Sequence, residues 1–163
     1  RIGKGWQEGK ASLAHVYMAG KVCDELLFDI LPHNDGGRLL APRMAIASLE
    51  DHHSLGLRIV LSMLRATGFA VSDYGRQDVR SLAALVRADR VEVLFISTLM
   101  LRSALRVKDL RRELTKTGCI PRIVVGGAPF LLDPLLHTKV GADDMGRDAS
   151  EAVRIAMAHR REV

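Results

Sequence analysis

The sequence predicts an α/β protein in which helices cover both faces of a five-stranded parallel sheet. Between residues 43 and 160, short apolar segments alternate with longer amphipathic segments five times, which is typical of consecutive β-α units. The third apolar segment, VEVLFIS at 91–97, is apolar at nearly every position, as expected for a central strand. The amphipathic segment after the second strand begins at Asp78, a residue type that caps helix N-termini.

The N-terminal part of the chain is expected to be helical. Residues 10–31 carry apolar or small side chains at three- and four-residue spacing, which predicts an amphipathic helix. The segment PHNDGG at 32–37 follows, with one proline and two glycines, and is the one credible linker. We therefore expect an N-terminal helical segment and linker at 1–37 and a second domain at 38–163. The chain does not begin with Met, so we expect further sequence before it.

The β-α units are expected in order along the second domain. Strands are expected at 43–49, 69–74, 91–97, 122–127 and, as a short edge strand, 141–143. Helices are expected at 55–66, 78–88, 101–116, within 129–140 and at 149–160. Thr67 and Gly68 mark the end of the first of these helices. Such doubly wound sheets are flavodoxin-like or Rossmann-like, and the flavodoxin-like strand order is 2-1-3-4-5.

Unusual residues follow three neighbouring strands of this sheet. DHHSLG at 51–56 follows the first strand, STL at 97–99 ends the third, and Gly126-Gly127 ends the fourth. Ligands of such sheets bind beyond the carboxyl ends of the strands, near the point where strand order reverses, so we expect a binding site there. Each feature alone also has an ordinary explanation, because a glycine pair suits a tight turn, Ser97 suits a helix N-cap, and a loop histidine suits solvent.

Composition narrows the classes of partner. The chain has 24 Lys+Arg and 19 Asp+Glu, but these charges are interspersed along helices, and aromatic residues make up only 4%. This favours a solvated helical surface over a nucleic-acid-binding face, because base stacking needs aromatic side chains. No apolar run approaches the roughly 20 residues needed to span a membrane. The two cysteines, Cys23 and Cys119, form no C-x-x-C pair and predict a reducing, cytoplasmic setting.

Asp51 and His53 have the spacing of a histidine oriented by a carboxylate. The carboxylate can accept the proton on one ring nitrogen, which fixes the tautomer and makes the other nitrogen a better ligand or base. No second histidine, cysteine or carboxylate lies at metal-cage spacing, which disfavours a zinc site built by the protein alone. A lone imidazole suits a cofactor that brings its other metal ligands with it. The absence of G-x-G-x-x-G and Walker A sequences weakens a nucleotide-binding interpretation.

Three short motifs, in this order, resemble the signature D-x-H-x-x-G … S-x-L … G-G of the cobalamin (vitamin B12)-binding domain family: Asp51-x-His53-x-x-Gly56, Ser97-x-Leu99 and Gly126-Gly127. The gaps between the motifs, 40 and 26 residues, agree as well. GADDMGRDASEAV at 141–153 is similar to the family's closing segment, and the resemblance covers about residues 43–160. Within the family, the chain resembles corrinoid proteins of methyltransferase systems, and its N-terminal helix loosely resembles the end of their helical module.

The resemblance implies a role for each motif residue. His53 would ligate cobalt from below in place of the cofactor's own dimethylbenzimidazole, whereas His52 falls on a variable position. Asp51 would hydrogen-bond the other ring nitrogen, Ser97 would extend this relay, and Gly56 would leave room beside the corrin. The slot that buries the displaced nucleotide tail would be lined by Ser97, Leu99, Gly126 and Gly127. Replacing either glycine of the pair should therefore weaken binding before it destabilises the fold. The implied cofactor is cobalamin, as methylcobalamin or, alternatively, adenosylcobalamin.

The function that this resemblance implies first is that of a methyl carrier. The chain would shuttle a methyl group between donor-side and acceptor-side methyltransferase subunits, supplying ligation and presentation. An alternative is a cobalamin-dependent sensor or light-sensing domain, although photoreceptors carry Glu-His where this chain, after Trp6, has Val16-Tyr17. Further alternatives are the cobalamin-binding module of a radical mutase and a flavodoxin-like domain without a cofactor. Neither nucleic acid nor a membrane is expected as a partner.

Overall fold

The computed structural model describes residues 42–161 and, before them, only residues 5, 8–12, 14, 15, 18, 19, 22 and 26. Most of the helix predicted at 10–31 and the linker predicted at 32–37 lie outside the described residues. The residues on which the light-sensing alternative depends also lie outside them: Trp6, Val16 and Tyr17. The chain divides into two compact units, Arg1–Pro32 and His33–Val163. The domain boundary predicted between residues 37 and 38 stays a prediction.

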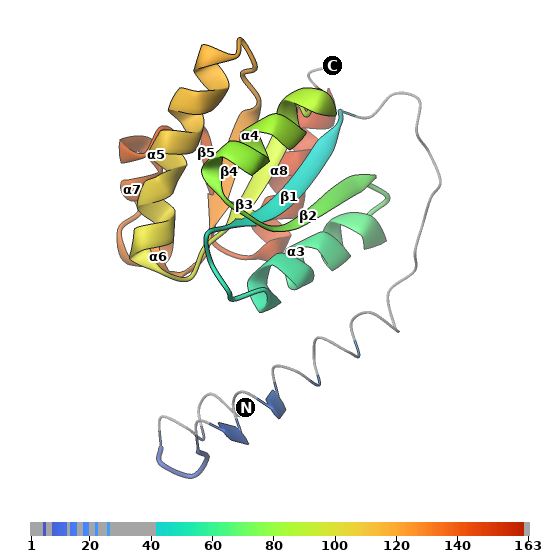
Figure 1. Ribbon diagram of the computed structural model, residues 1–163. Helices are drawn as coiled ribbons and strands as arrows, with labels where there is room; N and C mark the ends of the chain where they lie inside the picture. The colour runs from blue at the N-terminus through green and yellow to red at the C-terminus, as the bar shows by residue number, and fades with distance from the viewer. Residues whose placement is uncertain are drawn as a thin grey trace. The chain divides into compact units, whose positions relative to one another are not determined.

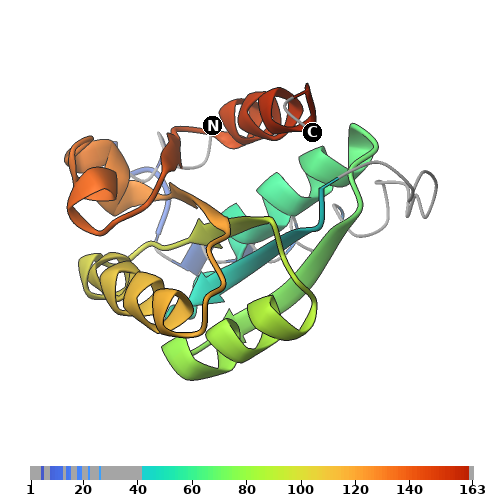
Figure 2. The same ribbon diagram turned by 90° about the horizontal axis from the view of Figure 1, so that it is seen from above.

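Five parallel strands form one sheet, in the spatial order β2-β1-β3-β4-β5 (Figure 1). The strands are β1 (Met44–Leu49), β2 (Val71–Gln77), β3 (Val93–Ser97), β4 (Arg122–Gly126) and β5 (Asp144–Gly146). Figure 2 shows the sheet between two layers of helices. One layer consists of α3 (Leu55–Ala66) and α8 (Ala149–Arg161), and the other of α4 (Val79–Ala88) and α5 (Leu101–Lys116). The predicted flavodoxin-like fold is confirmed.

Alternate side chains of the central strands enter different cores. All six residues of β1 are buried. Met44 and Ile46 belong to a core shared with α3 and α8, which we call the α3/α8 core. Ala45, Ala47 and Leu49 belong to a core shared with α4 and α5, the α4/α5 core. This division follows from strand geometry, because successive side chains point to opposite faces of the sheet.

Several predicted elements are confirmed in detail. The helices predicted at 55–66 and 101–116 have these bounds in α3 and α5. Asp78 caps α4, because its Oδ1 accepts hydrogen bonds from the backbone N–H groups of Arg80 and Ser81 at 2.9 and 3.0 Å. The short helix predicted within 129–140 is present as two, α6 (Ala128–Leu132) and α7 (Leu136–Lys139). They are separated at Pro134, which has no N–H with which to continue a helix.

Strands β5 and β2 differ most from their predicted bounds, whereas β1, β3 and β4 differ by one or two residues at one end. The edge strand predicted at 141–143 is wrong, because β5 begins at Asp144, which pairs with Val124. Gly141 has a φ of 77° and belongs to the turn after α7. Strand β2 begins later than predicted and extends to Gln77, which pairs with Leu49. Among the described residues, no helix is both long enough and apolar enough to cross a membrane.

Candidate functional site

The three motifs lie side by side at the carboxyl ends of β1, β3 and β4. Ser48 pairs with Ser97, and Ser97 pairs with Gly126, so these strands end at the same level. The β1–α3 loop (50–54) and the β3–α5 loop (98–100) therefore leave the sheet along one edge. This is the edge at which the strand order predicts a binding site.

Asp51 is at the centre of the contacts between these two loops. Only 1% of its side chain is exposed. Its Oδ1 accepts a hydrogen bond from the backbone N–H of His53 at 3.1 Å and lies 2.8 Å from Nδ1 of the same residue. Its Oδ2 accepts from the backbone N–H groups of Leu99 and Met100 at 2.7 and 2.9 Å. The carboxylate thus joins the β1–α3 loop to the β3–α5 loop.

The hydrogen bonds to Asp51 determine its charge. Burial acts to raise the pKa of this carboxyl group, because a desolvated carboxylate is costly to ionise. The hydrogen bonds from the Met100 N–H, the His53 ring, the Leu99 N–H and the His53 N–H act in the opposite direction and prevail. Together they lower the pKa from 3.8 to about 2. Asp51 is therefore ionised near neutral pH and can accept the proton on Nδ1 of His53.

The contact with Asp51 leaves one nitrogen of His53 available. With the proton held on Nδ1, the neutral imidazole carries its free lone pair on Nε2. The His53 side chain is 58% exposed. Among the described residues, Nε2 has no hydrogen-bond partner. His52 is exposed and forms no hydrogen bond within the described part of the chain. His53 is thus the histidine of the pair whose ring is held by a carboxylate and whose second ring nitrogen is left without a partner among the described residues.

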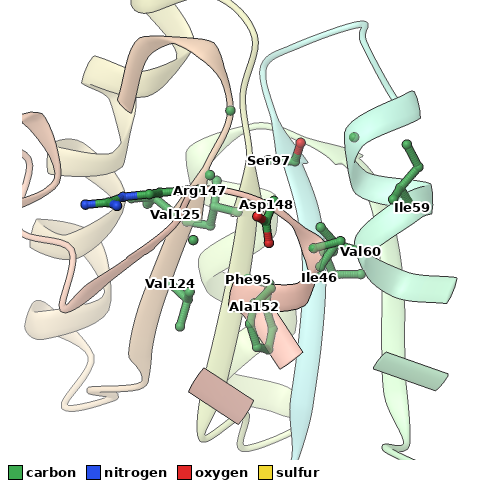
Figure 3. Close-up of a pocket in the computed structure, with 16 residues that line it drawn as sticks. Ile46, Ile59, Val60, Phe95, Ser97, Val124, Val125, Arg147, Asp148 and Ala152 are labelled. Carbon is green, nitrogen blue, oxygen red and sulfur yellow. The ribbon is translucent and has the colours of Figure 1, made fainter. Parts of the chain in front are cut away.

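An apolar cavity of about 310 Å³, which we call the slot, opens at the same edge of the sheet. Figure 3 shows Ile59 and Val60 on α3, Phe95 and Val124 on the sheet, and Ala152 on α8 around it. Its volume is at the lower end of the range of about 300–1,000 Å³ that is typical of small-molecule sites. The predicted site residues that line the slot are Gly56, Ser97, Gly126 and Gly127.

Leu99 does not line the slot as predicted, and Ser97 lines it but does not extend the relay. Leu99 is not among the residues that line the slot, and its contribution to the site is its backbone N–H on Asp51. The relay predicted between Asp51 and Ser97 is not formed in the described structure, because two backbone N–H groups bind Oδ2 instead. The Ser97 hydroxyl lies beside the first turn of α3, where a Cβ on Gly56 would come within 3.3 Å of its Oγ.

The two paired glycines have different surroundings. A Cβ on Gly126 would lie 3.2 Å from the carbonyl oxygen of Gly146, a tight contact. Gly127 has a φ of 116°, and a Cβ there would lie 1.7 Å from the carbonyl oxygen of Thr98. The expectation that replacement affects binding before folding is therefore wrong for Gly127. Any side chain at this position would conflict with the backbone of Thr98 unless one of the two segments shifted.

Sequence reasoning missed the side of the slot that is formed by the β5–α8 loop. Arg147 and Asp148 line the slot there (Figure 3). Oδ1 of Asp148 accepts from the Glu151 N–H, and Oε2 of Glu151 accepts from the Arg147 N–H, both at 2.8 Å. These reciprocal bonds resemble a capping box and fix the start of α8. The signal was available in the sequence as D-x-x-E at the start of the last helix. Within the described residues, no group of three or more His, Cys, Asp or Glu could hold a metal ion.

Comparison with known proteins identifies the family. A family model described as the B12 binding domain matches residues 44–155. The chain belongs to the B12-binding domain family. This B12-binding domain is 30% identical over 159 residues to the trimethylamine corrinoid protein of Methanosarcina barkeri, and the match covers 93% of this chain and 72% of the relative.

Two solved structures share the fold of this B12-binding domain. The monomethylamine corrinoid protein of Methanosarcina barkeri matches with a TM-score of 0.77 and 26% identity, over 97% of this chain and 76% of that one. A chain of the methanol:cobalamin methyltransferase complex of the same organism matches with a TM-score of 0.65 and 23% identity, over 98% of this chain and 62% of that one. The first match agrees with the family assignment, and the second shows the fold.

The site of this B12-binding domain fits a corrinoid on two observations. The His53 side chain is exposed and its ring is held by Asp51, whereas the described residues supply no metal cage of their own, so the chemistry of the donor set suits a metal that arrives with its other ligands. The slot beside it is walled by apolar side chains and glycines, which suits the burial of a long, mostly uncharged tail.

Proposed function

We propose that this B12-binding domain is the corrinoid carrier of a methyltransferase system and that His53 is the lower ligand of cobalt. The observation that carries the proposal is the 2.8 Å contact between Nδ1 of His53 and the buried carboxylate of Asp51. The contact leaves the lone pair of Nε2 available on a side chain that is 58% exposed, at the edge of the sheet where the slot opens. The coarser assignment is supported by relatives named corrinoid proteins.

Each part of the chain has a defined task in this proposal. Nε2 of His53 binds the metal, and Asp51 holds the proton on Nδ1 and thereby the orientation of the ring. The slot between α3 and α8 buries the nucleotide tail, with Gly56, Gly126 and Ser97 at its walls. When bound, the corrinoid supplies the chemistry of accepting and releasing a methyl group. The chain supplies ligation, orientation and exclusion of water, and it needs no general acid or base beyond the Asp51–His53 pair.

The proposed partners are methyltransferase subunits, one on the donor side and one on the acceptor side. The proposal is supported by the names of the relatives, which refer to trimethylamine and dimethylamine corrinoid proteins, and by a chain of the same fold in a methanol:cobalamin methyltransferase complex. These names make methylated amines and methanol the first donors to test. The proposed form of the cofactor is methylcobalamin, and adenosylcobalamin is the alternative. The corrinoid extracted from the purified protein distinguishes the two.

The ligation is tested by comparing His53→Ala with the matched control His52→Ala. The parent, loaded with cobalamin and reduced to cobalt(II), should show the electron paramagnetic resonance splitting of one axial nitrogen. His53→Ala should lose this splitting and show a cofactor without nitrogen ligation, whereas His52→Ala should be nearly unchanged. The reverse result would refute the assignment of His53.

The carrier role is tested separately with the chain loaded with isotopically labelled methylcobalamin. Label should move to an acceptor only when a methyltransferase encoded beside this chain is added. Retention of the label with every such partner, together with normal cobalamin binding, would contradict the carrier role but leave the ligation intact.

A further inference from the structure

Glu50 connects the β1–α3 loop to α5 through both its backbone and its side chain. Its carbonyl oxygen accepts a hydrogen bond from Oγ of Ser103 at 3.1 Å. Nε of Arg106 lies 3.2 Å from both carboxylate oxygens of Glu50, and Nη2 lies 3.2 Å from Oε1. Ser103 and Arg106 are one turn apart on α5, so they share one face of the helix. This face therefore holds Glu50 at two points.

The backbone of Glu50 has a conformation that is costly for any residue with a Cβ. Its φ is 49°, in the left-handed region, where Cβ crowds the following carbonyl group. A residue persists in this region only where its surroundings hold it there. The surroundings here are the contacts with α5 and a hydrogen bond from the Glu50 N–H to the carbonyl oxygen of Gln77 at 2.9 Å.

The same part of α5 is connected to Asp51. The N–H groups of Leu99 and Met100, which hold Oδ2 of Asp51, directly precede the first residue of α5. Glu50 and Asp51, consecutive residues that precede His52 and His53, are thus fixed from α5 and from the loop that leads into it. Arg106 is itself oriented by an ion pair with Asp109. The guanidinium therefore lies between two carboxylates and has few alternative positions.

We propose that Glu50 and Arg106 are positioning residues for His53. Their ion pair holds the left-handed turn that sets the direction of the Asp51–His53 pair, and neither side chain is a hydrogen-bond partner of the imidazole. Neither residue belongs to the three motifs that identify the family. The effect on cobalt ligation rests on the proposed function. The orientation of the ring does not, because it is a property of the chain without its cofactor.

The orientation is measured on the complete cofactor-free chain by nitrogen-15 NMR of the His53 ring. The parent should be mainly in the tautomer with the proton on Nδ1. Arg106→Ala should lower the ratio of the Nδ1–H to the Nε2–H tautomer about two- to fivefold, the effect expected for the loss of one partly exposed ion pair. Arg112→Ala is the matched control, because Arg112 also pairs with Asp109, at 3.6 Å, but forms no ion pair with Glu50. Equal ratios in the two variants would overturn the proposal.

Substitutions of Glu50 separate the ion pair from the backbone conformation. Glu50→Ala and Glu50→Gly both lose the carboxylate, but only glycine adopts a positive φ at little cost. The tautomer ratio should therefore decrease in the order parent, Glu50→Gly, Glu50→Ala. If Glu50→Ala is not folded by circular dichroism, Arg106→Lys replaces it, since lysine keeps the charge but loses the planar fork. A ratio in Glu50→Ala or Arg106→Lys equal to that of the parent would also overturn the proposal.

The cobalamin-loaded chain provides the measurement that concerns the metal. The fraction of cobalt with an axial nitrogen should fall in Arg106→Ala, while the total amount of bound cobalamin stays close to that of the parent. One possible result is a lower tautomer ratio in Arg106→Ala but no nitrogen ligation even in the parent. This result would refute the proposed function and support the positioning role. Nitrogen ligation in the parent, with an unchanged tautomer ratio in Arg106→Ala, would refute the positioning role alone.

Discussion

Gly127 and Thr98 are packed backbone to backbone. A Cβ on Gly127 would lie 1.7 Å from the carbonyl oxygen of Thr98, and the Thr98 N–H donates to the carbonyl oxygen of Gly126 at 3.0 Å. The end of β4 and the β3–α5 loop therefore approach one another more closely than any side chain would allow. Because the next residues of this loop hold Asp51, the glycine also supports the site indirectly.

Gly127→Ala should destabilise the cofactor-free chain by about 2–4 kcal/mol, because the strain of a positive φ adds to the steric conflict with Thr98. Gly68→Ala is the matched control. Gly68 has a φ of 88°, but a Cβ there would meet no atom within 4 Å. Gly68→Ala should therefore lower the free energy of unfolding only through backbone strain, by about 1 kcal/mol. Urea unfolding at neutral pH measures both free energies. Equal losses would show that the contact with Thr98 relaxes freely.

Val60→Phe should obstruct the slot and leave the histidine intact. Val60 lines the slot from α3, and a ring there occupies space proposed for the nucleotide tail. The affinity for cobalamin should fall by roughly one to two orders of magnitude, whereas cobinamide, which lacks the tail, should bind about as it does to the parent. Met63→Phe is the control, since Met63 is a partly buried residue of the same helix that does not line the slot. Equal weakening for both corrinoids would contradict the tail-binding role.

Asp51→Asn should retain the corrinoid but weaken the bond between cobalt and the imidazole. An amide stabilises the proton on Nδ1 of His53 less than a carboxylate does. In addition, its NH2 group replaces one of the two oxygens that now accept hydrogen bonds, and so faces N–H donors. Losses of this kind are typically about 10–100-fold in metal affinity. The measurement is the pH at which nitrogen ligation disappears, which should rise relative to the parent. Asp73→Asn, which removes an exposed carboxylate on β2, should leave that pH unchanged.

The cofactor-free chain should lose part of its stability in acid because of Asp51. The pKa of Asp51 is lowered from 3.8 to about 2 in the folded chain, so the ionised group stabilises the fold above about pH 4. This contribution, about 2 kcal/mol, is lost as the pH falls from 4 toward 2. The difference in unfolding free energy between the parent and Asp51→Asn should therefore shrink over this interval. A difference that is constant from pH 5 to pH 2 would show that Asp51 is not held as described.

The sequence was sufficient for the features that depend on periodicity and residue type. Hydrophobic spacing predicted the bounds of α3 and α5, and the apolar character of 91–97 predicted the central strand β3. The spacing between Asp51 and His53 predicted their contact, because the two residues are close neighbours in one short loop. These are local relationships, for which the amino-acid pattern carries most of the information.

Features that depend on backbone contacts between distant segments could not be predicted in this way. The sequence does not show that the N–H groups of Leu99 and Met100 point at Asp51, and the family resemblance implied instead that Ser97 extends the relay. The contact of Thr98 with Gly127 is likewise a product of strand register. The left-handed φ of Glu50 is opposite to the preference of its residue type, and only the structure shows it.

The slot and the α5 residues that contact Glu50 belong to different layers of the molecule. Ile59 and Val60 of α3 and Ala152 of α8 form walls of the slot on one face of the sheet, whereas Ser103 and Arg106 belong to α5 on the other. Because the sheet separates these residues, we expect single substitutions in one layer to act independently of those in the other. Under the proposed function, the slot would therefore adapt to corrinoids with different tails while the orientation of the imidazole is preserved. The affinity for the tail and the strength of the proposed axial bond would then change along separate mutational paths.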